Sequence, residues 1–228
     1  MSHLKRLDTL SIDQTYALEA AAGQLESEFV GVFGRETIEK FLASSYDQFA
    51  DHAKVVNYLP LLAERFARQR LHALSRIETE PRDGKPVILF LCVHNAGKSQ
   101  MALGFMKKLA GDRAIGWSGG SEPGTGLNEH SVAAMREVGI DISGEFPKPW
   151  TEETLKAADV VVTMGCGDAC LVYPGKRYLD WSIDALPGTS IENVRPVRDE
   201  IEQRVRGLLA ELGVEVNDAG VEDKVATS

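Results

Sequence analysis

The sequence lacks several features that define broad protein classes. Its 228 residues hold only three cysteines, Cys92, Cys166 and Cys170, an odd number that does not suit a disulfide scaffold. No run of about 18 apolar residues is present, and the N-terminus has no apolar signal core, so we expect a cytoplasmic protein without membrane contact. Lys and Arg number 25 against 34 Asp and Glu, which argues against a nucleic-acid partner.

Apolar residues recur at helical spacing through the first 80 positions. The pattern predicts helices over residues 11–33, 35–52 and 56–77, with Ser11 as an N-cap and Gln14 completing a capping box. Three short amphipathic helices predict a small bundle over residues 1–80, which we interpret as a candidate homodimerisation module. The polar stretch 81–86, with two prolines and a glycine, is typical of a linker.

The periodicity changes at Val87. A continuous apolar run over 87–91 predicts a strand buried on both faces. Further strands (114–117, 159–163 and 177–181) and helices (99–110, 128–138, 151–157 and 191–212) alternate along the chain. This alternation predicts an α/β domain over residues 87–216, built on a doubly wound parallel sheet. We expect a flexible tail over 217–228.

The loop after the first strand carries the main chemical signal. It consists of Cys92, Val93, His94, Asn95, Ala96, Gly97, Lys98 and Ser99. A Walker A loop would need a glycine where Cys92 stands, so a nucleotide-binding loop is disfavoured. A cysteine facing a helix N-terminus meets inward backbone amides and the positive end of the helix dipole, which favour a thiolate and a tetrahedral oxyanion. Lys98 adds positive charge and Ser99 a hydrogen-bond donor, so the loop suits thiolate attack on phosphate or arsenate; the alternative is a Cys92 that only fills the core.

Together with the segments 118–123, 139–142, 147–150 and 163–168, this loop resembles the arsenate reductases that share the fold of low-molecular-weight protein tyrosine phosphatases. The resemblance spans roughly residues 86–213, and the helical bundle resembles an extension found in actinobacterial-type members. It implies that Cys92 attacks arsenate and that residues 93–99 bind the oxyanion, with phosphate or sulfate able to occupy the same loop. It implies no cofactor. We expect Asn95 to shape the loop by side-chain hydrogen bonds, and Ser121 and Asn128 to support it.

Two positions depart from the family pattern. The family has arginine where this chain has Lys98, which replaces a bidentate fork with a point charge and could cost on the order of 2–4 kcal/mol in the transition state. The family also places a general-acid aspartate where an ungapped match puts Ala185. Asp184 lies beside that position and is the candidate acid; a plain surface carboxylate is the alternative.

Cys166 and Cys170 follow the strand predicted over 159–163. Zinc needs four ligands, and the nearby supply is two thiols and Asp168, so we expect no metal. Two interpretations of Cys166 and Cys170 remain: they are unrelated buried cysteines, or they form a redox pair. The resemblance implies the second: Cys166 and Cys170 resolve the Cys92 intermediate in a disulfide relay that thioredoxin recycles.

Two alternatives to an arsenate reductase stay open from the residues. One is a phosphatase that uses Cys92 as nucleophile and Asp184 as acid. The other is an arsenic- or redox-responsive oxyanion-binding protein with little turnover, in which the bundle contacts a partner.

Overall fold

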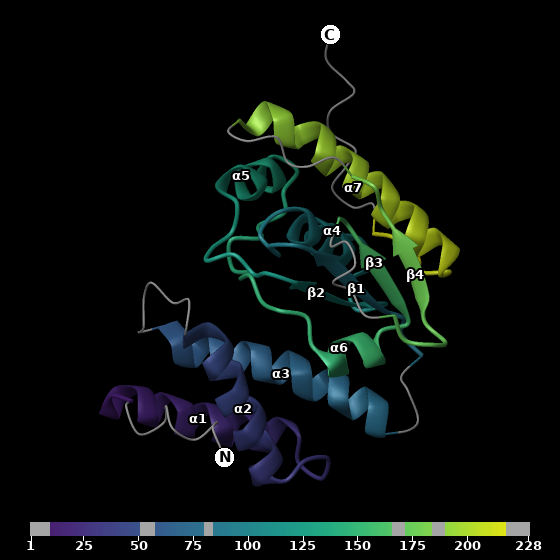
Figure 1. The fold of residues 1–228 in the computed structure, drawn as a ribbon. Coiled ribbons are helices and arrows are strands. Elements are labelled where there is room, and N and C mark those ends of the chain that lie inside the picture. Colours follow the sequence, from purple (N-terminus) through teal and green to yellow (C-terminus); the bar gives the residue numbers. More distant parts are fainter. Residues whose placement is uncertain (1–9, 51–57, 80–83, 166–171, 184–189, 218–228) are drawn as a thin grey trace. The chain divides into compact units, whose positions relative to one another are not determined.

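The computed structural model describes residues 10–50, 58–79, 84–165, 172–183 and 190–217. The chain forms two compact units (Figure 1). The first comprises residues 1–82 together with the interior segment 151–157, and the second comprises residues 83–150 and 158–228. No helix in these described ranges is long and apolar enough to cross a membrane.

The first unit is a bundle of α1 (Ile12–Glu28), α2 (Arg35–Ala50) and α3 (Leu59–Glu78). Ser11 and Gln14 form the predicted reciprocal capping box at the start of α1. The core of the bundle is apolar and contains, among others, Leu25, Ile38, Leu42 and Leu71. These side chains recur every three or four residues on their helices, so burying them together accounts for the packing of the bundle.

Helix α6 (Glu152–Ala157) also belongs to the first unit, although the sequence pattern places it within the α/β domain. It packs on α3, and the guanidinium of Arg70 pairs with the carboxylate of Glu153. The same guanidinium lies 4.7 Å from the ring centre of Phe41 and donates to the hydroxyl of Ser44. Two residues 83 positions apart in the chain are therefore joined by a half-buried charged contact.

The second unit is built on a four-stranded parallel sheet with the order β2-β1-β3-β4. The strands are β1 (Val87–Cys92), β2 (Ile115–Gly120), β3 (Val160–Thr163) and β4 (Arg177–Asp180). Helices α4 (Lys98–Ala110), α5 (Glu129–Glu137) and α7 (Ile191–Glu211) pack against one another beside it (Figure 1). The predicted α/β class with a parallel sheet after a helical region is confirmed.

The core of the second unit fixes where Cys92 lies. Alternate residues of β1, namely Ile88, Phe90 and Cys92, join the cluster formed with α4 and α7. In the sheet, β2 lies on one side of β1 and β3 lies on the other, so the order of the strands has a switch point between β1 and β3. Ligands of open α/β sheets bind at such a switch point, outside the carboxyl ends of the strands. Cys92 is the last residue of β1 and therefore stands at that edge.

Candidate active site

The loop between β1 and α4 turns its carbonyl groups away from the thiol. Every carbonyl from Cys92 to Gly97 accepts a hydrogen bond from a group outside the loop. The donors to residues 92, 93, 94 and 96 are the amides of Ser121, Glu122, Gly124 and Asn128, and those to 95 and 97 are the side chain of Gln100 and the amide of Met101. With these carbonyls bound outside the loop, the N–H group of Asn95 faces the Cys92 sulfur. A loop with its carbonyls turned outward and its N–H groups turned inward binds tetrahedral anions.

The thiol of Cys92 is buried, with 6% of the residue exposed, and its sulfur is in hydrogen-bond contact with two groups of the loop. The amide of Asn95 lies 3.2 Å from Sγ and the hydroxyl of Ser99 lies 3.0 Å from it. Ser99 is in the first turn of α4, so the sulfur also faces the positive end of that helix. The Asn95 N–H donates to this sulfur, and the thiol stands where a bound oxyanion would meet it as a nucleophile.

Asn95 shapes the loop through both ends of its amide. Its nitrogen donates to the Ser99 hydroxyl at 2.8 Å, and its oxygen accepts from the amide of Lys148 at 3.0 Å. Asn95 has a positive φ of 48°, which non-glycine residues rarely adopt. The hydrogen bonds of its buried side chain stabilise this conformation, as local side-chain bonds of asparagine commonly do in turns.

Gly120, at the end of β2, allows the loop to lie close to the sheet. A Cβ at this position would come within 2.6 Å of the Val93 carbonyl oxygen and 3.0 Å of the Asn95 amide nitrogen. Both neighbours are backbone atoms of the loop, so a side chain here is incompatible with the observed path.

Lys98 reaches across the carboxyl edge of the sheet. Its ammonium donates to the carbonyl of Ile183 at 3.1 Å, and a Cβ added to Gly165 would lie 3.7 Å from Nζ. Gly165 and Ile183 immediately precede Cys166 and Asp184 in the sequence. Lys98 therefore joins the Cys92 loop to the two segments that lead into the other predicted site residues.

The structure describes some of the predicted site residues and not others. Residues 93–97 form the loop between Cys92 at the end of β1 and Lys98 and Ser99 at the start of α4, and the ring of His94 contacts the carbonyl of Glu122 at 3.1 Å on the exposed side. Ser121 and Asn128 contact the loop through their main-chain N–H groups. Cys166, Cys170 and Asp184 lie outside the described residues, so their predicted roles stay predictions.

Three buried polar residues near the loop were missed by the sequence reasoning. Gln100, Ser118 and Lys148 are at most 2% exposed, and they contact Asn95 or one another. Gln100 was visible as a polar residue directly after Ser99, but only its position on the buried side of α4 shows that it faces the loop. Lys148 lies in the segment 147–150 that carries part of the family resemblance, but a lysine between two prolines is usually a surface residue, so its burial was not predicted.

Comparison with protein families places both parts of the chain. Residues 87–218 match the model of the low molecular weight phosphotyrosine protein phosphatase family, and residues 18–75 match the protein-tyrosine-phosphatase-like N-terminal domain. The chain belongs to the low-molecular-weight phosphatase family. This family assignment agrees with the resemblance carried by the Cys92 loop.

Individual relatives within the family are described as arsenate reductases. A structure of the Corynebacterium glutamicum thioredoxin-dependent arsenate reductase is 40% identical, with a TM-score of 0.78, covering 88% of this chain and 98% of that one. The arsenate reductase of Halalkalibacterium halodurans is 42% identical over 132 residues, which are 54% of this chain and 94% of the relative. An arsenate reductase in a phosphate-binding state is 32% identical, with a TM-score of 0.50, over 56% of this chain and 98% of that one.

Proposed function

We propose that this protein is an arsenate reductase in which Cys92 is the nucleophile. The observation that carries the proposal is the buried Cys92 sulfur, in contact with the Asn95 amide and the Ser99 hydroxyl inside a loop whose carbonyls are all held outward. Such a loop binds a tetrahedral oxyanion above a thiolate. The 40% identity to a thioredoxin-dependent arsenate reductase over most of the chain supports arsenate as the oxyanion.

The reaction follows from three thiols and one arsenate. The Cys92 thiolate attacks arsenic, and hydroxide leaves as water after protonation, giving a Cys92 sulfur–arsenic adduct. The Cys166 thiolate attacks Cys92 Sγ; the sulfur–arsenic bond breaks, and its electron pair leaves with arsenic, which departs as arsenite. Cys170 then attacks Cys166, which frees the Cys92 thiol and leaves a Cys166–Cys170 disulfide. Thioredoxin reduces this disulfide in our proposal, so the two electrons come from its dithiol.

Lys98 supplies positive charge to this loop in place of the family arginine. An ammonium contributes a point charge and rotatable donors, whereas a guanidinium would hold two oxygens at once. We infer that Lys98 helps to hold the oxyanion and that phosphate or sulfate competes with arsenate there. In this proposal Asp184 has a smaller role in arsenate reduction than in ester hydrolysis. A general acid is needed most where a poor alkoxide leaving group must receive a proton, which is the case in ester hydrolysis.

A single turnover without reductant tests the proposal. Reduced protein is mixed with one equivalent of arsenate, and arsenite and free thiols are then counted. We expect one arsenite per chain and a fall from three thiols to one. Cys170→Ser should still release one arsenite while its two thiols fall to none, and Cys92→Ser should release none and keep both thiols.

Two outcomes contradict the proposal. No arsenite with three intact thiols in the parent chain refutes the relay. Turnover of p-nitrophenyl phosphate by Cys166→Ser/Cys170→Ser, without arsenite formation by the parent, identifies a phosphatase instead.

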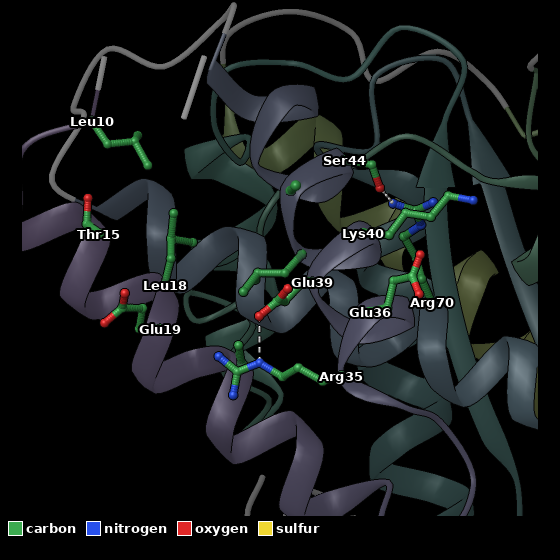
Figure 2. A pocket seen from close by; sticks show the side chains of 13 residues that line it. Leu10, Thr15, Leu18, Glu19, Arg35, Glu36, Glu39, Lys40, Ser44 and Arg70 are labelled. Atoms are coloured by element: carbon green, nitrogen blue, oxygen red, sulfur yellow. Dashed lines mark hydrogen bonds and ion pairs between the residues drawn. The ribbon is translucent and has the colours of Figure 1, made fainter. Parts of the chain in front are cut away.

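We also propose that the bundle mediates a homodimer. Its helices α1 and α2 border a cavity of about 720 Å³ whose lining includes the apolar side chains of Leu10, Leu18 and Leu42 (Figure 2). Ile12 and Tyr16 of α1 are 75% and 69% exposed, which leaves apolar surface on the same helix. Sedimentation at high micromolar concentration should show a dimer, and a monomer there refutes this assignment.

A further inference from the structure

A buried hydrogen-bond network extends from the Cys92 loop to Ser118 and Lys148, within the second unit. Gln100 Nε2 lies 3.0 Å from each of three acceptors: the Asn95 carbonyl oxygen, Asn95 Oδ1 and the Phe146 carbonyl oxygen. Gln100 Oε1 lies 3.5 Å from the hydroxyl of Ser118, which is 3.4 Å from the ammonium of Lys148. Asn95, Ser99, Gln100 and Ser118 are fully buried and Lys148 is 2% exposed.

The direction of donation in this network is determined at three points. The amide of Lys148 contacts Asn95 Oδ1 at 3.0 Å, and a backbone N–H can only donate. The end of Gln100 that faces three oxygens must be its NH2 group, because an oxygen there would lie 3.0 Å from three other oxygens with no hydrogen from Gln100 between them. At the far end, the Lys148 ammonium has no acceptor capacity, so it donates to Ser118, and the Ser118 hydroxyl donates to Gln100.

This direction extends to the sulfur. With Asn95 Oδ1 occupied by two donors, the Asn95 NH2 group faces Ser99 Oγ at 2.8 Å and donates to it. The Ser99 hydroxyl accepts there, so its own hydrogen is directed to Cys92 Sγ at 3.0 Å. A reversed network would point the Ser99 hydrogen at Asn95 and remove a donor from the sulfur.

We propose that Gln100 is a positioning residue that orients the Asn95 amide and thereby makes Ser99 a hydrogen-bond donor to the Cys92 thiolate. Gln100 does not touch the substrate in this role; it acts through Asn95 and Ser99. The inference rests on Cys92 as the nucleophile of the proposed function. Its test follows the thiol itself, so a failure of arsenate reduction and a failure of this inference are distinguishable.

The test measures alkylation of Cys92 by iodoacetamide across pH. The full chain carries Cys166→Ser and Cys170→Ser, so Cys92 is its single thiol. We expect Gln100→Met to slow alkylation about threefold at pH 7 and to move the half-maximal rate about 0.5 pH unit higher, because one of two donors to Asn95 Oδ1 is lost. The same substitution at the exposed Gln203 is the matched control and should leave the profile unchanged.

A double-mutant cycle separates positioning from a merely structural effect. If Gln100 acts through Ser99, then Gln100→Met adds no further loss in a Ser99→Ala background. An unchanged profile with Ser99 present, or an equal loss in both backgrounds, overturns the proposal. If Gln100→Met does not fold, Gln100→Glu keeps the shape of the side chain and removes its N–H donors. The added charge acts in both backgrounds, so a larger loss of alkylation rate with Ser99 present supports the proposal. An equal loss of rate in both backgrounds refutes it.

Discussion

Replacing Gly120 by alanine tests the geometry of the loop most directly. The added Cβ would lie 2.6 Å from the Val93 carbonyl oxygen, and ordinary contact begins at 3.4 Å, so the loop must move by about 0.8 Å. The obstructing atoms are backbone atoms, which no side-chain rotation can clear. A displacement of about 1 Å in a reacting group can cost about 100-fold in rate, so we expect a loss of that order in single-turnover arsenite formation.

The same substitution should cost about 1–3 kcal/mol in the free energy of unfolding, as overpacking typically does. Gly126→Ala is the matched control, because a Cβ at Gly126 has nothing within 4 Å, and it should change the rate by less than about twofold. Quenched-flow arsenite release and urea unfolding measure the two effects. A folded Gly120→Ala variant that turns over at the parental rate would refute the reasoning, since the loop would not need its close contact with β2.

Two further predictions concern charged residues. Lys98→Met should lower arsenate kcat/KM about 100-fold, because it removes a donor to the oxyanion. The control is Lys108→Met, at an exposed position of the same helix, which should change kcat/KM by less than about twofold. Equal effects of the two variants would contradict the role of Lys98. Hydrogen bonds from Arg195, and then from Arg198, lower the pKa of Glu137 from 4.5 to about 2, so its stabilising effect is full above pH 4.5 and is lost as the pH falls towards 2. Glu137→Gln should therefore melt below the parent at pH 7, with a gap that closes over that range; a gap independent of pH would show that the ion pairs are not its cause.

The order of helices and strands was predictable because each element carries its own periodicity. The continuous apolar run of β1 and the capping box of α1 are local signals, and both were read correctly. The end of α1 was not: the pattern predicted a helix to residue 33, but it ends at Glu28, and Gly31 adopts a positive φ of 76° in the turn that follows. Apolar residues continue through that turn, so periodicity alone extended the helix too far.

The sequence by itself determined the family and the nucleophile candidate. Cys92 and the seven residues after it form one contiguous segment between a strand and a helix, so their placement depends on local chain geometry. Only the tertiary structure decided what holds that loop in shape. Gln100, Ser118, Gly120 and Lys148 come from different elements, and their contacts with Asn95, with the loop backbone or with one another depend on how the sheet and helices pack. The assignment of α6 to the bundle has the same origin, because a partner some 80 positions away leaves no periodic trace in the segment itself.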